Sequence, residues 1–328
     1  MHDTPISRRD MVKFTGAALA ALGAGGMTGR AHAAAPSRPA AARARVMRLA
    51  HLTDFHIQPE RRAAEGAAAC LRHVQSEHKP DLIFTGGDLI MDGFAADEAR
   101  TKLQWELLVK TLKDECSTPI AHCLGNHDIW GWHKGESKTS GNEPLWGKKW
   151  ATDQLALDRP YHALDRAGWR LFALDSVRPD PLDANGYIGA LDDEQFDWLT
   201  RELAATPKTT PVLLVSHIPI LTATVVLGGP NKETGLRQVT SGLLHADSPK
   251  LRELFAKHPN VKLCLSGHMH RIDRVDFRGV TYLCNGAVSG NWWKGRHHEC
   301  DEGYAVIDLF DDGSFEHRYV TYGWKAEA

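Results

Sequence analysis

Five short polar clusters occur along the chain, and each directly follows an apolar run. They are Asp54-Phe55-His56, Gly86-Gly87-Asp88, Gly125-Asn126-His127-Asp128, Ser216-His217 and Gly267-His268-Met269-His270. Carboxylate and amide oxygens mixed with imidazole nitrogens suit borderline divalent metals and ferric iron better than soft metals. Each cluster alone is a common chance pattern, but five in this setting indicate a metal site.

Spacing within the clusters suggests how the side chains are presented. If the segments holding Asp54-x-His56 and His268-x-His270 are extended, the two side chains of each pair lie on the same side of the backbone. Each pair is then expected to face one metal site. The glycines of the clusters are expected to allow tight turns and a close approach of the backbone to the ions.

Alternating apolar runs and amphipathic stretches predict the elements that carry the clusters. Strands are expected at 46–52, 81–86 and 119–124, with helices near 62–77 and 95–113 between them. This βαβαβ order predicts mainly parallel pairing. Because ligands bind at the carboxyl edge of such sheets, the clusters should converge there.

The second half of the chain continues this pattern and then changes. Strands are predicted at 169–175, 211–216 and 261–265, and helices near 192–204 and 248–257. Closely spaced strands with Gly-containing turns follow at 272–277, 280–284, 303–309 and 314–321. These last four are expected to form a second, more antiparallel sheet packed against the first.

Two long connections, near 129–160 and 220–247, are interpreted as loop insertions, because loops of this length are usually functional or disordered. Aromatic faces stack on bases or sugars, and Lys or Arg holds phosphate. The candidate substrate contacts are therefore Trp130, Trp132, Lys134 and Trp146 in the first loop, and Trp292, Trp293 and Lys294 in the run 291–296. An alternative of equal weight is that Trp292 and Trp293 close the hydrophobic core.

In order and spacing, the clusters from Asp54 to His270 resemble the calcineurin-like metallophosphoesterase superfamily. The resemblance implies an α/β (α+β) fold, a four-layer double β-sandwich flanked by helices. It implies that one metal is bound by Asp54, His56 and His270, and the other by Asn126, His217 and His268, with Asp88 bridging them. His127 resembles the family's outer-sphere catalytic histidine, and Asp128 resembles the carboxylate that orients it.

Finer features place the chain within this superfamily. Purple acid phosphatases carry a tyrosine ligand three positions after the bridging aspartate, where this chain has Met91. The chain resembles instead the branch of bacterial cyclic-nucleotide and glycerophosphodiester phosphodiesterases. The implied reaction is hydrolysis of a phosphodiester by metal-bound hydroxide, with two divalent or Fe/divalent ions drawn from Fe, Mn, Zn and Co. A phosphomonoesterase and a non-catalytic scaffold of the same fold are the alternatives.

The N-terminus reads as a twin-arginine signal peptide. Ser7 to Lys13 includes the arginine pair, a weakly apolar stretch follows, and Ala31-His32-Ala33 is a small-x-small cleavage site. The apolar stretch 14–27 is shorter than the ~20 residues that cross a bilayer, so no permanent membrane anchor is expected. We predict a signal peptide at 1–33, a disordered leader at 34–45 and a catalytic domain at 46–328. We also predict that the twin-arginine export machinery carries the protein, which is then periplasmic or secreted.

Composition narrows the class of protein and of partner. The 328 residues are 42% hydrophobic and 24% charged, as in a soluble globular domain. With 39 basic and 41 acidic residues there is no basic excess, so a nucleic-acid partner is not indicated and a small phosphate ester is expected.

Other cysteines and histidines carry weaker signals. The six cysteines form no Cys-x-x-Cys pattern, and both buried thiols and one or two disulfides fit their spacing. Several histidines lie outside the polar clusters and are interpreted as surface or packing residues, namely His73, His78, His122, His162, His245, His258 and His317.

Overall fold

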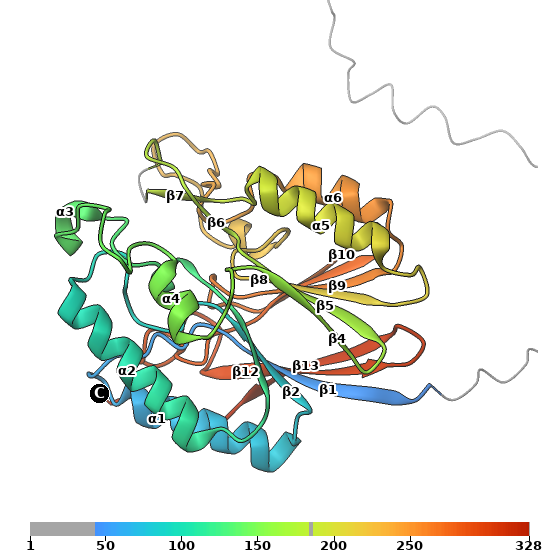
Figure 1. Ribbon diagram of the computed structural model, residues 1–328, viewed down its shortest axis with the longest axis horizontal. Helices are drawn as coiled ribbons and strands as arrows, with labels where there is room; N and C mark the ends of the chain where they lie inside the picture. The colour runs from blue at the N-terminus through green and yellow to red at the C-terminus, as the bar shows by residue number, and fades with distance from the viewer. Residues whose placement is uncertain (1–42, 184–185, 328) are drawn as a thin grey trace, which may run out of the picture. The chain divides into compact units, whose positions relative to one another are not determined.

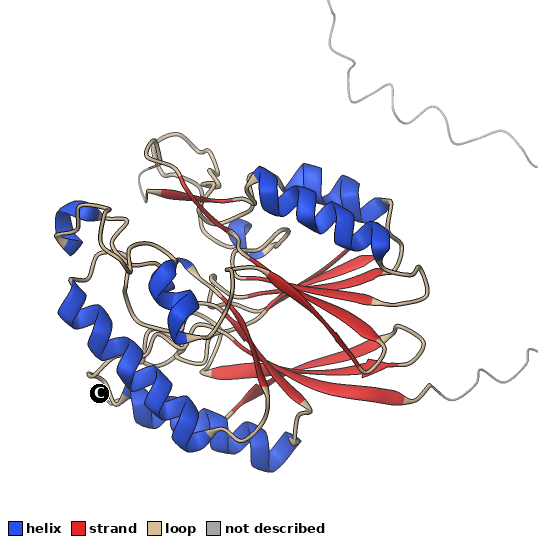
Figure 2. Cartoon of the chain, viewed as in Figure 1, coloured by secondary structure: helices blue, strands red, loops and turns tan. Residues whose placement is uncertain are grey.

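The computed structural model describes residues 43–183 and 186–327. The predicted signal peptide, and the predicted leader up to residue 42, lie outside the described residues. Two mixed sheets lie face to face, and helices cover the outer face of each (Figures 1 and 2). This confirms the predicted four-layer α/β sandwich.

The first sheet has the strand order β13-β12-β1-β2-β3. Its centre is the predicted parallel βαβαβ unit of β1 (Arg45–Leu52), β2 (Leu82–Gly86) and β3 (Ile120–Cys123). β12 (Gly303–Phe310) runs antiparallel beside β1, and β13 (Phe315–Thr321) closes that edge. The connecting helices α1 (Ala63–His73) and α2 (Glu98–Glu115) pack on its outer face.

The second sheet has the order β10-β11-β9-β8-β5-β4. The parallel strands are β5 (Trp169–Leu174), β8 (Val212–Ser216), β9 (Val261–Ser266) and β11 (Val280–Cys284). β4 (His162–Arg166) and β10 (Asp273–Phe277) are antiparallel edge strands. Helices α5 (Asp193–Ala205) and α6 (Ser248–Ala256) cover its outer face.

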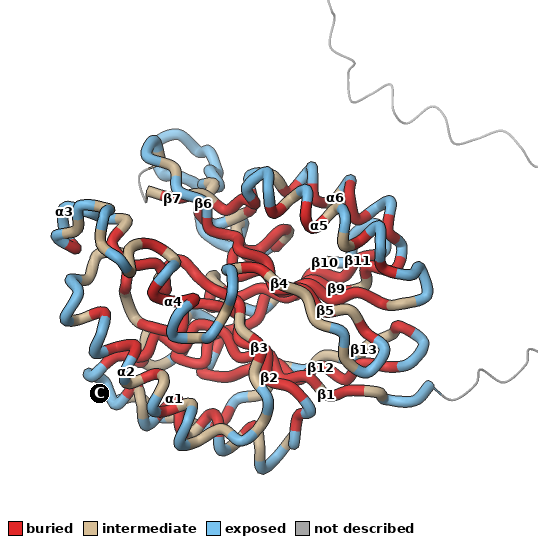
Figure 3. The backbone as a smooth tube through the Cα atoms, viewed as in Figure 1, coloured by how far each residue is buried: buried red, intermediate tan, exposed pale blue. Residues whose placement is uncertain are grey.

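The C-terminal strands do not form a sheet of their own, so that prediction was wrong. β10 and β11 extend the second sheet through β9, whereas β12 and β13 extend the first through β1. Turn residues identify the two hairpins, but the sheet that each hairpin joins depends on long-range pairing. β12 is buried along its whole length, which suits a strand inside a sandwich (Figure 3).

Three apolar layers hold the four structural layers together. Alternate residues of both sheets, including Leu49, Phe84 and Leu213, fill the space between them. Separate clusters seat α1 and α2 on the first sheet, and α5 and α6 on the second. The parallel strands between these layers end at one edge, where the polar clusters begin.

The long loops contain a few short elements that the sequence patterns did not predict. α3 (Lys134–Ser137) and α4 (Lys149–Gln154) lie in the first insertion, and a 3-10 turn (Thr224–Val226) lies in the second. A small hairpin of β6 (Val177–Pro179) and β7 (Tyr187–Gly189) follows β5.

Two further predictions can be compared with the fold. Every cysteine is a free thiol, and five of the six are buried, so the structure favours buried thiols over disulfides. Among the described helices, none combines the length and the apolar character needed to cross a membrane.

Candidate metal centre

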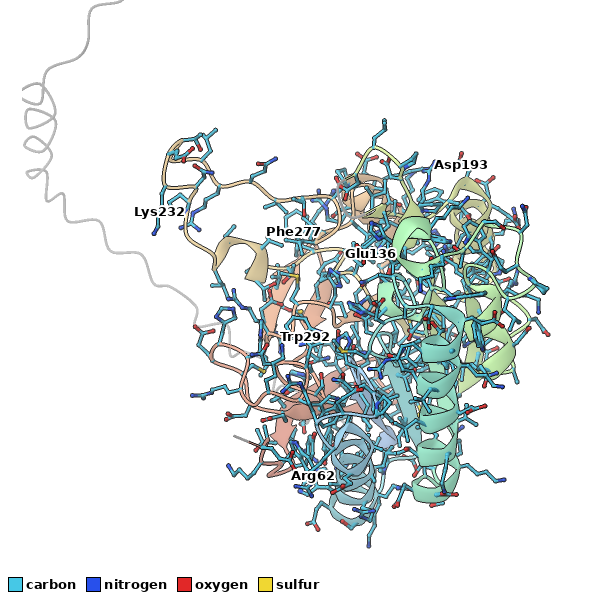
Figure 4. The ribbon with its side chains drawn as sticks, turned by 90° about the vertical axis from the view of Figure 1, so that its left-hand side faces the viewer. Arg62, Glu136, Asp193, Lys232, Phe277 and Trp292 are labelled. Carbon is cyan, nitrogen blue, oxygen red and sulfur yellow. The ribbon has the colours of Figure 1, made fainter. Side chains whose placement is uncertain are left out.

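The five polar clusters meet at one edge of the sandwich. They follow the C-terminal ends of β1, β2, β3, β8 and β9, which are parallel neighbours within the two sheets. Figure 4 views the molecule onto this edge, with Trp292 near the centre. The side chains predicted as metal ligands are brought together there, as the topology predicted.

A first group consists of Asp54, His56 and His270, all of them buried. The Nε2 atoms of His56 and His270 lie 3.0 Å apart, and His270 Nε2 is 3.2 Å from Asp54 Oδ1. His270 donates its Nδ1 proton to the Gly290 carbonyl, which leaves the Nε2 lone pair facing the group.

A second group is formed by Asp88, His217 and His268, with Asn126 beside them. His217 Nε2 lies 3.2 Å from Asp88 Oδ2 and 3.1 Å from Asn126 Oδ1. His268 Nδ1 is 3.2 Å from the same His217 nitrogen. His217 Nδ1 donates to the Gly86 carbonyl, so its Nε2 is the ring nitrogen that faces the group.

Asp88 lies between the two groups. Its Oδ2 is 3.6 Å from His56 Nε2 in the first group and 3.2 Å from His217 Nε2 in the second. Asp88 Oδ2 therefore lies within 3.6 Å of an imidazole nitrogen of each group.

The electrostatics fit cations at these positions. Burial raises the pKa of Asp88, but the His217 and His127 imidazoles outweigh it and hold the pKa well below its usual range. Burial lowers the pKa of His217, but the Asp88 carboxylate raises it to about 9. Asp54 is likewise held below its usual pKa, because His270 outweighs the effect of burial. The two buried carboxylates favour positive charge beside them, which a proton on His217 or a bound cation can supply.

The backbone at the ligands differs from the extended form expected from the sequence. The φ values are 58° at Asp54, 44° at His56, 51° at Asp88, 67° at His268 and 51° at His270. Left-handed backbone at non-glycine residues costs roughly 1–3 kcal/mol each and persists where surrounding contacts enforce it. His268 and His270 fall into different groups, whereas Asp54 and His56, whose backbone is also left-handed, lie in one group.

Glycines allow the chain segments to approach the ligands closely, as expected. A Cβ atom on Gly125 would lie 2.2 Å from Asp88 Oδ1, and one on Gly267 would lie 2.3 Å from Asp54 Oδ2. Any side chain at these two positions would displace a candidate ligand.

His127 and Asp128 do not interact as the family resemblance implied. His127 is part-exposed, its Nε2 is 4.0 Å from Asp88 Oδ2, and its Nδ1 pairs with the Met91 carbonyl oxygen. The Asp128 carboxylate is buried and accepts from the backbone N–H groups of Gly125, Leu89 and Ile90. Asp128 therefore hydrogen-bonds to the turns that carry Asp88 and Asn126. The group that orients His127 is the Met91 carbonyl.

Two of the predicted substrate contacts, Trp130 and Trp293, are buried in the protein interior instead. Trp130 is 2% exposed, packs edge-on against Trp150 and donates to the Ala96 carbonyl. Trp293 is 1% exposed, and its Nε1 donates to the carbonyls of Phe55 and His56. Neither indole can contact a substrate, but Trp293 fixes the backbone that presents His56.

Trp292 is the predicted substrate residue whose ring lies against the side chains of two candidate ligands. Its half-buried ring lies 4.5 Å from the His270 ring and 5.7 Å from the His56 ring, measured between centroids. Trp132 belongs to a separate cluster with Phe94 and Trp146.

The lysines proposed as substrate contacts are both exposed. The Lys134 ammonium lies over the Trp146 ring, within the first insertion. Lys294 follows the buried Trp293, and Figure 4 shows the neighbouring Trp292 on the same edge of the sandwich.

Several supporting residues escaped the sequence analysis. Thr53 Oγ1 donates to Asp54 Oδ2 at 2.5 Å, and Ser289 Oγ donates to the Asp54 carbonyl at 2.7 Å. His245, interpreted from the sequence as a surface or packing residue, is buried next to Ser216. Thr53 and Ser216 each precede a candidate ligand in the chain, which is the one sequence signal that could have indicated them.

Residues 47–271 match the family model of the calcineurin-like phosphoesterases. The chain belongs to this family, and it is a phosphoric ester hydrolase whose clustered ligand side chains fit the metal dependence of the family.

Individual relatives agree with this classification. The chain is 27% identical to a probable cyclic nucleotide phosphodiesterase of Synechococcus, over 83% of this chain and 91% of the relative. It is 26% identical to the 3′,5′-cyclic adenosine monophosphate phosphodiesterase of Escherichia coli K12, over 75% and 77%. A dimetal phosphatase from Danio rerio shares the fold with a TM-score of 0.56 and 16% identity, covering 85% of this chain and all of that one.

Proposed function

We propose that the chain hydrolyses phosphodiesters at a centre of two metal ions, and that 3′,5′-cyclic nucleotides are its substrate class. The observation that carries the dinuclear centre is the position of Asp88 between two groups of converging ligands. Curated relatives named as cyclic nucleotide phosphodiesterases support the substrate class.

In this proposal each group of side chains holds one ion. Asp54, His56 and His270 would hold the first, Asn126, His217 and His268 would hold the second, and Asp88 would contact both. Two such ions, divalent or Fe/divalent and drawn from Fe, Mn, Zn and Co, would neutralise phosphoryl charge and activate a water molecule at neutral pH.

His127 is the candidate group for moving a proton to the substrate. Its Nδ1 donates to the Met91 carbonyl, so a second proton on Nε2 makes the ring an imidazolium. That Nε2 faces Asp88 from the part-exposed side of the centre. There it can stabilise a phosphoryl oxygen or protonate a leaving alkoxide.

A substrate panel tests the activity and its alternative, phosphomonoester hydrolysis. Purified protein reconstituted with metal is assayed on cyclic nucleotides, glycerophosphodiesters, lipid head-group phosphates and simple monoesters. We expect the highest kcat/KM on a cyclic nucleotide. Faster turnover of monoesters than of any diester would replace the proposal with the phosphatase alternative.

Trp292 is expected to bind the nucleobase, because its half-buried ring lies against two candidate ligands of the first ion. Stacking of a base on an aromatic side chain contributes ~1–3 kcal/mol, so Trp292→Ala should raise KM for 3′,5′-cyclic AMP by about 5- to 150-fold. KM for glycerophosphoethanolamine, which has no base, should change little.

Trp132→Ala is the matched control, because this half-buried indole packs in a different cluster. Equal increases in KM for both substrates, or an equal effect of the control, would remove Trp292 from base recognition.

Export is proposed from the sequence of residues 1–33, with the mature protein beginning at Ala34. Replacing both Arg8 and Arg9 with lysine is expected to block translocation, because the paired arginines define the signal. N-terminal sequencing of the periplasmic fraction checks the cleavage site. Undiminished export of the double variant would refute the twin-arginine route.

A further inference from the structure

The second long loop returns to the strand end that carries His217. The His245 backbone N–H donates to the Pro219 carbonyl at 3.0 Å, and Ser248 Oγ donates to the Ile220 carbonyl at 2.6 Å. The loop therefore leaves β8 and comes back to the same place. In Figure 4 its exposed middle, marked by Lys232, projects away from the sandwich.

The side chain of His245 connects two polar groups across this junction. Its Nε2 lies 3.0 Å from Ser216 Oγ, and its Nδ1 lies 2.8 Å from Asp247 Oδ1. The other carboxylate oxygen of Asp247 accepts from the Leu191 backbone N–H at 3.0 Å. Asp247, His245 and Ser216 are therefore linked by side-chain hydrogen bonds, and the Leu191 backbone holds the Asp247 end.

Ser216 passes this constraint to His217. Ser216 Oγ also donates to the Ile218 carbonyl at 2.9 Å. This hydrogen bond joins the residues on either side of His217. The Ile218 backbone N–H donates to Ser176 Oγ at 3.0 Å. The backbone on both sides of His217 is thus held by buried side-chain hydrogen bonds.

An Asp–His–Ser arrangement is also the pattern of a nucleophilic hydroxyl, but burial excludes that role here. Ser216 is 1% exposed and His245 is 2% exposed, so neither can contact a substrate. Their influence must pass through the neighbouring His217, whose Nε2 faces Asp88 and Asn126.

We propose that Asp247, His245 and Ser216 form a positioning relay for His217, and that this relay sets the metal affinity of the second group. The inference rests on the proposed dinuclear centre. Hydrogen-bonded partners behind a ligand commonly contribute 10- to 100-fold in metal affinity, because they fix the orientation of the ligand.

The test is titration of metal-free protein with Co²⁺, followed by calorimetry and visible absorption. Ser216→Ala removes one oxygen and leaves the packing in place, whereas His245→Gln removes the ring. Each should weaken one of two Co²⁺ positions by about 10- to 100-fold and leave the other unchanged. The double variant should bind Co²⁺ with about the same affinity as the single variant that binds it less tightly, because both changes interrupt one relay.

His258→Gln is the matched control. This histidine is also buried, but it follows the far end of α6 and contacts Lys208. Equal weakening of both positions in the relay variants, or the same effect in the control, would overturn the relay. A wild-type protein that binds fewer than two Co²⁺ ions would instead overturn the dinuclear centre itself.

Discussion

Asp88→Ala is expected to abolish stable binding of both metal ions and to lower phosphodiester hydrolysis below about one-thousandth of the wild-type rate. Asp88 is the carboxylate that reaches the ligands of both groups, at 3.6 Å and 3.2 Å. Bound metals stabilise the developing charge by several kcal/mol. A loss of ~4 kcal/mol corresponds to about 10³ in rate.

Metal analysis after dialysis, together with a hydrolysis assay, checks this expectation. His270→Ala is the comparison, because its imidazole belongs to the first group and should mainly weaken one ion. Two ions per chain retained by the Asp88 variant would refute the bridging assignment, whatever the activity.

His127→Ala should have the second largest effect, but on the rate alone. His127 Nε2 lies at the edge of the centre, 4.0 Å from Asp88 Oδ2, and its Nδ1 is engaged by the Met91 carbonyl. Both ions should therefore stay bound, while kcat falls by roughly 10² to 10⁴, the usual contribution of a positioned acid–base group.

The leaving group separates the two roles open to His127. A nitrophenolate needs little protonation, whereas an alkoxide needs much more, so a general acid predicts the larger defect on an alkyl ester. Equal losses on both esters would indicate stabilisation of a phosphoryl oxygen. Near-wild-type turnover of both, with two metals bound, would exclude His127 from the mechanism.

The parts of the fold that could be predicted are those governed by local pattern. The βαβαβ unit and its polar clusters were predictable because apolar runs mark parallel strands, and parallel strands end at a common edge. The pairing of β12 with β1 joins segments more than two hundred residues apart, and no local signal in the chain specifies it.

Within the site, residue type was predictable from sequence but surroundings were not. A tryptophan in a Gly-rich loop can face solvent or core, and Trp293 and Trp130 prove to be buried whereas Trp292 lies against the ligands. Asp128 follows His127 directly, yet the 3-10 turn at 126–128 directs its carboxylate to backbone N–H groups instead. Such orientations depend on local backbone geometry.

The left-handed backbone at five candidate ligands is a further feature that pattern could not predict. Asp and His are both enriched in this conformation, but most residues of either type do not adopt it, so residue type alone does not predict it. Contacts from elsewhere in the chain hold it in place, including the Gly87 and Asp88 carbonyls, which accept from the N–H groups of Asp54 and His56.

Anomalous diffraction from crystals of the Mn²⁺-loaded protein tests the central claim most directly. The proposed centre predicts two peaks ~3.5–4 Å apart, with the Asp88 carboxylate between them. Asp54, His56 and His270 should surround one peak, and Asn126, His217 and His268 the other. A single peak, or a second peak that does not contact Asp88, would contradict a shared dinuclear centre.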